Sequence, residues 1–77
     1  MNVAISQAEL KKGIVYTFES DDYEMTLEYS TMRIGRPLYM VYFNGAYYGF
    51  ITFRAAVKKA DNLVTKYNLF KHPVEIA

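Results

Sequence analysis

The chain has 77 residues, of which 52% are hydrophobic and 17% aromatic, and it contains no cysteine. This length predicts one domain spanning residues 1–77, and the hydrophobic content is too high for a disordered chain. A domain of this size buries only about 60–65% of the surface that its unfolded chain exposes. With no cysteine for disulfides and a single histidine, we expect its stability to come from large side chains, a partner subunit, or both.

The sequence indicates no membrane segment. Its apolar runs are short and interrupted, whereas a transmembrane helix needs about 20 consecutive apolar residues. The N-terminal residues lack the basic stretch followed by a long apolar one that marks a signal peptide. The absence of cysteine fits a reducing compartment, so we expect a cytoplasmic protein.

The net charge is +1, but the charged residues are unevenly distributed along the chain. Residues 1–31 hold two lysines and six acidic residues, while residues 32–77 hold seven lysines and arginines and two acidic residues. This division predicts a dipolar molecule that orients against a charged partner.

The N-terminal segment, residues 1–12, is predicted to contain a short helix. Ser6 and Glu9 have the spacing of a capping box, in which the serine hydroxyl accepts from the backbone N–H of the glutamate and the glutamate side chain reaches back. Gly13 tolerates the left-handed backbone that commonly follows a helix. We therefore expect the helix at about residues 7–12.

Residues 13–52 are predicted to form a four-stranded antiparallel meander. Residues 14–19 and 23–30 alternate between apolar and polar side chains, which is typical of half-buried strands. Asp21 and Asp22 are expected to join these two strands, because aspartate side chains hydrogen-bond nearby backbone and favour turns.

The third and fourth strands are predicted from the turn between them. Asn44-Gly45 separates the apolar runs at residues 38–43 and 46–51. An Asn-Gly pair between β-type runs is a strong hairpin signal, because both positions accept the positive φ of a type I′ turn. A two-residue hairpin is therefore expected here.

From Phe53 onwards the apolar period becomes helical. Thr52 is a plausible N-cap, and Pro73 argues against further helix in the tail at 69–77. The apolar stripe consists of Phe53, Ala56, Val57, Ala60, Leu63, Val64 and Tyr67. The resulting fold class is α+β, with the amphipathic helix at residues 53–68 packed on one face of the sheet.

The faces of the sheet depend on the length of the turn before the third strand. An even-numbered turn around residues 33–36 would set Tyr29 opposite Met40 and Leu27 opposite Tyr42. An odd-numbered turn would exchange the two faces of the last two strands, because side chains alternate with a period of two. With the even-numbered turn, one face away from the helix would hold an aromatic patch made of Tyr39, Val41, Phe43, Tyr48 and Phe50.

Such a patch, if exposed, is typical of an interaction site, and tyrosine and phenylalanine are enriched in interface cores. The same residues are compatible with two further arrangements. In the first, the N-terminal helix or the apolar tail covers the patch within one molecule. In the second, two copies associate through it as a homodimer.

The sequence provides little support for catalysis. His72 is the only histidine and lies in the tail, and there is no cysteine nucleophile. Glu19, Glu24 and Glu28 match no recognised metal-binding spacing, and the glycines form no phosphate-binding loop. We therefore expect no catalytic residues, metal, cofactor or small-molecule substrate.

Nucleic-acid binding is the alternative hypothesis. The strand–strand–helix stretch, with Gly45, Gly49, Phe50 and Thr52, resembles the layout of integrase arm-type DNA-binding domains over less than half of the chain. That resemblance implies DNA contact through the sheet, but here the corresponding strands carry no basic residue. The candidate phosphate contacts are instead Arg33, Arg36, Arg54, Lys58, Lys59 and Lys66.

The favoured hypothesis is a small, non-enzymatic protein-binding module. Phe, Tyr, Met, Ile, Asn and Lys total 32 residues against 16 for Gly, Ala, Arg and Pro, a bias typical of AT-rich coding genomes such as those of many bacteriophages. We therefore expect a phage or mobile-element accessory protein that binds and inhibits a host protein.

Overall fold

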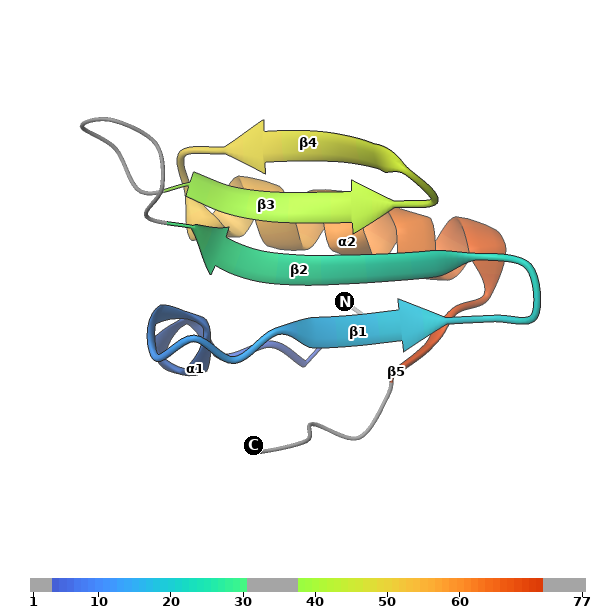
Figure 1. Ribbon diagram of the computed structural model, residues 1–77, viewed down its shortest axis with the longest axis horizontal. Helices are drawn as coiled ribbons and strands as arrows, with labels where there is room; N and C mark the ends of the chain where they lie inside the picture. Colours follow the sequence, from blue (N-terminus) through green and yellow to red (C-terminus); the bar gives the residue numbers. More distant parts are fainter. Residues whose placement is uncertain (1–3, 31–37, 72–77) are drawn as a thin grey trace.

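The computed structural model describes residues 4–30 and 38–71, and Figure 1 shows their arrangement. The α+β class is confirmed: two helices accompany one antiparallel sheet, which has five strands rather than the four predicted. In chain order the elements are α1 (Gln7–Lys11), β1 (Tyr16–Glu19), β2 (Glu24–Ser30), β3 (Leu38–Phe43), β4 (Ala46–Phe50), α2 (Phe53–Tyr67) and β5 (Phe70–Lys71). Neither described helix is long and apolar enough to cross a membrane.

The additional strand, β5, comes from the segment that was predicted to be an irregular tail. The strand order is β4-β3-β2-β1-β5, so α2 carries the chain from one edge of the sheet to the other (Figure 1). Phe70 and Lys71 pair with Glu19 and Phe18 on the outer side of β1. A two-residue strand has no measurable periodicity, which explains why the sequence pattern did not reveal it.

The predicted Asn-Gly hairpin is confirmed. Asn44 and Gly45 have φ values of 44° and 89°, and Phe43 pairs with Ala46 across the turn. Asn44 also ties this turn to its neighbour, since its Oδ1 accepts a hydrogen bond of 2.8 Å from the backbone N–H of Glu24. The turn residue therefore positions β2 as well as β4.

The assumed register between β2 and β3 is wrong by one residue. Tyr29 lies opposite Tyr39 and Leu27 opposite Val41, where Met40 and Tyr42 were expected. The reason is that β3 is apolar throughout, so its sequence does not distinguish the buried face from the open one. Only the number of residues in the preceding connection decides between them.

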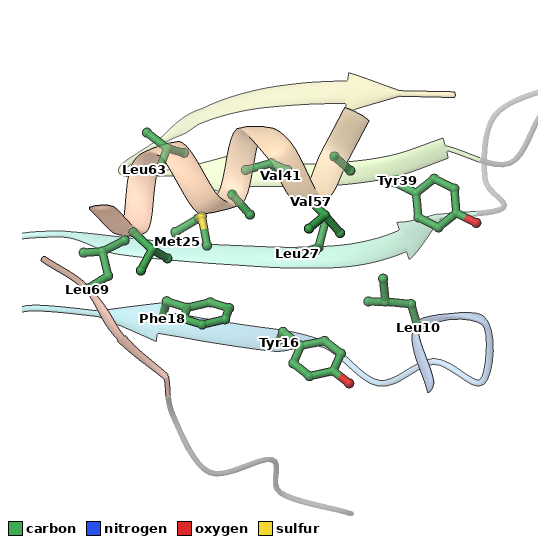
Figure 2. Packing of buried hydrophobic residues seen from close by; sticks show 13 residues of the cluster. Leu10, Tyr16, Phe18, Met25, Leu27, Tyr39, Val41, Val57, Leu63 and Leu69 are labelled. Carbon is green, nitrogen blue, oxygen red and sulfur yellow. The ribbon is translucent and has the colours of Figure 1, made fainter. Parts of the chain in front are cut away.

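The core lies between the sheet and α2. Figure 2 shows Leu27 and Val41 beneath this helix, with Leu10 of α1 closing one end of the cluster. Both helices contribute to the same buried cluster. The complete set of buried hydrophobic cluster residues is Leu10, Tyr16, Phe18, Met25, Leu27, Tyr39, Val41, Ala56, Val57, Ala60, Leu63, Val64 and Leu69.

The predicted caps of both helices are present, with one difference in α1. Thr52 Oγ1 accepts from the N–H of Ala55 at 3.2 Å, and Ser6 Oγ accepts from the N–H of Glu9 at 3.3 Å. The Glu9 carboxylate does not reach back to Ser6; it accepts a 2.6 Å hydrogen bond from the hydroxyl of Tyr16. That hydroxyl in turn accepts from the N–H of Ser6 at 3.2 Å. Tyr16 thus completes the capping box and fastens α1 to β1.

Leu27→Ala should destabilise the protein by about 2–5 kcal/mol, because it opens a cavity in the centre of the core. A single core in a domain this small rarely supplies more than about 3–5 kcal/mol, so a large fraction of the variant should be unfolded. Its strand neighbour provides the control, since Thr26→Ala removes a side chain from the other face. Urea denaturation followed by circular dichroism measures both variants, and equal losses would contradict the assigned faces.

Tyr16 gives the stability a pH dependence. Burial raises the pKa of its hydroxyl above the usual range, and the hydrogen bond to Glu9 raises this pKa further. Folding therefore favours the protonated tyrosine, so this contribution is complete below about pH 10, the unfolded pKa, and is lost as pH rises through the folded pKa. Denaturation midpoints between neutral and strongly alkaline pH should fall less steeply for Tyr16→Phe than for the wild type. Identical pH profiles would show that Tyr16 does not contribute.

Candidate interaction surface

The sheet has one face covered by both helices and a second face, here called the open face, on which no described helix packs (Figure 1). The strand pairing assigns the side chains to each face, because residues opposite each other point the same way. The open face consists of Thr17, Glu19, Glu24, Thr26, Glu28, Ser30, Leu38, Met40, Tyr42, Tyr47, Gly49 and Phe70.

The five residues of the predicted aromatic patch lie on the helix-covered face, so the expectation that they form an open patch is wrong. Tyr39 and Val41 are buried in the core, while Phe43 and Phe50 are half-buried against it. Tyr48 is 39% exposed at the outer edge of β4. The register error alone accounts for this, since a shift of one residue moves every side chain of β3 and β4 to the other face.

Tyr39 shows why these side chains belong to the fold. Its ring lies 5.0 Å from that of Tyr29 and 5.8 Å from that of Phe53. Its hydroxyl accepts a 2.8 Å hydrogen bond from Nε2 of Gln7. Tyr39 therefore connects β2, α1 and the first turn of α2, and a partner molecule has no access to its ring.

An apolar strip, formed by Met40, Tyr42, Tyr47 and Gly49, crosses β3 and β4 on the open face. The rings of Tyr42 and Tyr47 lie 6.5 Å apart, and these side chains are 37% and 65% exposed. Met40 lies across Gly49, where a Cβ atom would be only 3.3 Å from the methionine Sδ. Ile51, which follows β4, is 61% exposed. Met40 itself is buried, with 6% of its side chain exposed. The assumed register placed Met40, Tyr42 and Ile51 in the core, which is why the sequence did not identify Tyr42 and Ile51 as surface residues.

The other half of the open face is acidic. Glu19 lies directly opposite Glu24, and Glu28 lies opposite Met40 at the border of the apolar strip. No lysine or arginine belongs to the open face as described. The described part of this face therefore carries only negative charge, with tyrosines on one side of it.

The described basic residues lie on the side of the helices, and most of the lysines contact tyrosine rings. Lys59 Nζ lies 4.4 Å from the ring centre of Tyr48. Lys71, Lys66 and Lys11 lie 5.1, 5.4 and 6.0 Å from the ring centres of Tyr16, Tyr67 and Tyr29, respectively. Ammonium groups in such positions are attracted by the negative ring face. The described lysines and arginine therefore lie on the helix side, whereas Glu19, Glu24 and Glu28 lie on the open face.

Of the six predicted phosphate contacts, the structure describes four. Arg33 and Arg36 lie outside the described residues. Arg54 and Lys58 line a shallow groove of about 380 Å³ together with Phe53, Val57 and Asp61. Lys59 and Lys66 are separate from that groove and lie over Tyr48 and Tyr67.

Within residues 4–30 and 38–71, no cluster of three or more histidine, cysteine, aspartate or glutamate side chains is arranged to hold a metal ion. Comparison with protein-family models, with curated proteins and with solved structures finds no match for this chain. The likeness to integrase arm-type domains therefore remains one of layout.

Tyr39→Ala should destabilise the protein by about 3–5 kcal/mol, the range for truncating a buried aromatic residue. Tyr47→Ala should change the unfolding free energy by less than about 0.5 kcal/mol, since its side chain is mostly exposed. Thermal unfolding measures the stability of both variants and so shows which tyrosine lies on the helix-covered face and which on the open face. If Tyr47→Ala instead lost more stability than Tyr39→Ala, the register first expected between β2 and β3 would be the correct one.

Proposed function

We propose that this chain is a small protein-binding module whose contact surface is the open face. The supporting observation is the combination of exposed Tyr42 and Tyr47 with the carboxylates of Glu24 and Glu28 on one side of the sheet. Tyrosine is enriched in the centres of protein interfaces. The helices already supply the core, so the fold does not require these rings on the outside.

The chemistry of the open face supports one kind of partner. The apolar strip fits an apolar patch of another protein, and the carboxylates beside it fit lysine or arginine at the rim of that patch. Complementary charge of this kind accelerates encounter and selects the correct partner. A phosphate backbone would be repelled by the same carboxylates, which favours a basic protein over nucleic acid as the occupant of this face.

A basic surface on a host protein is also a surface on which nucleic acid binds. The carboxylates of the open face, seated there, would compete with phosphate groups for the same cations. This supplies a physical route by which a phage or mobile-element accessory protein inhibits its host protein. The AT-rich residue usage supports that origin, and the route itself follows from the charge of the open face.

Affinity capture from host cells, quantified by mass spectrometry, tests the proposal with matched variants. Tyr47→Ser and Glu28→Gln each alter the open face and should reduce partner recovery by about tenfold, the effect of losing roughly 1.4 kcal/mol. Tyr48→Ser changes the neighbouring side chain on the other face, and Asn62→Lys raises the net charge by one on α2. Both control variants should retain the partner.

The recovered partner should also dissociate as the salt concentration rises, because charge pairs contribute to its binding. Equal loss of the partner in test and control variants, or no loss in any of them, would refute the open face as the contact surface. A salt-dependent gel shift with DNA or RNA that is lost in Arg54→Gln would instead support the nucleic-acid alternative.

A further inference from the structure

The outer edge of β4 is a second surface, distinct from the open face. β4 stands at the end of the strand order and pairs only with β3 among the described strands. Four of its five residues are exposed, and the neighbouring Ile51 is exposed as well. An edge strand presents unpaired backbone groups on which another strand can build.

The register of the hairpin identifies those groups. The two-residue turn closes with the hydrogen-bonded pair of Phe43 and Ala46, and bonded and non-bonded pairs alternate along an antiparallel ladder. The N–H and C=O groups of Ala46, Tyr48 and Phe50 therefore point towards β3. Those of Tyr47 and Gly49 point away from the sheet.

This edge lacks the features that usually prevent strands from associating. Proteins protect edge strands with charged side chains, proline or bulges, and residues 46–52 contain no charged residue and no proline. The ladder to β3 runs without interruption from Ala46 to Phe50. The opposite edge of the sheet differs, since β5 has only two residues and one of them is Lys71. The two edges are therefore unequal, and β4 is the one available for pairing.

We propose that a second copy of this chain pairs with β4, antiparallel and edge to edge, so that two five-stranded sheets become one continuous sheet. Identical strands related by a two-fold axis are self-complementary, and no residue of β4 itself is charged. The nearest described cation is Lys59, which is held over the ring of Tyr48 on the helix side. With Tyr48 at the axis, Tyr47 lies opposite Gly49 of the second copy, where the missing side chain leaves room for the ring. The open face cannot mediate this contact in the same way, because its carboxylates would face their own copies.

The proposal does not depend on the proposed function, although pairing would join the open faces of two copies into one longer surface. Such a surface would present two apolar strips side by side, flanked by carboxylates at both outer ends. A partner with repeated basic and apolar patches would then bind both copies at once, and its overall affinity would rise because the second contact is intramolecular.

Analytical ultracentrifugation combined with amide hydrogen exchange tests the contact. From micromolar to millimolar concentration, the mass should rise from that of one chain to that of two. Over the same range, exchange at the N–H groups of Tyr47 and Gly49 should slow by about tenfold or more, because they become hydrogen-bonded. The amides of Phe70 and Lys71, at the other edge, should be unchanged.

Two variants separate the backbone contact from the side chain. Tyr47→Pro removes an outward N–H and should remain monomeric, whereas Tyr47→Thr retains this N–H and should still dimerise. A chain that is monomeric at millimolar concentration would overturn the proposal. So would a dimer in which the amides of Tyr47 and Gly49 exchange as in the monomer. Glu28→Gln distinguishes the two proposals, since it should weaken partner capture while leaving self-association intact.

Discussion

The pairing of β2 with β3 is the constraint on which the rest of the structure depends. Because Leu27 lies opposite Val41, the side chains of Met25, Leu27, Tyr39 and Val41 point to the same face of the sheet. These side chains form the surface on which α2 packs. The same pairing turns Met40 and Tyr42 outwards and so creates the open face. A different register would exchange the two sets and would place the carboxylates beside Tyr39. Fold, surface and proposed function therefore all follow from one alignment of two strands.

Electrostatics then gives the two faces different roles. The helix side carries lysines that lie over tyrosine rings, so much of its positive charge is held against its own aromatic residues. The open face carries carboxylates and no described lysine or arginine. Two of these carboxylates, Glu19 and Glu24, stand opposite each other on neighbouring strands. The proposed basic partner would complement these carboxylates.

Local signals in the sequence predicted local structure well. The Asn44-Gly45 turn, the Thr52 cap and the stripe of α2 each depend on neighbouring residues, and all are present. The faces of β3 and β4 depend on a distant pairing, and their uniformly apolar sequence offered no preference. The five candidate residues of β3 and β4 were therefore assigned to the wrong face. β5 was missed because its pairing with β1 is a tertiary contact.

The most direct test of this account is a nuclear Overhauser measurement on methyl-labelled protein. Cross-peaks are expected from the methyl groups of Val41 to those of Ala56 and Ala60 on α2, and none is expected from the methyl group of Met40 to α2. Cross-peaks from Met40 to α2, with none from Val41, would show that β3 faces the other way. In that case the open face described here would be the core, and the proposal for its function would fail with it.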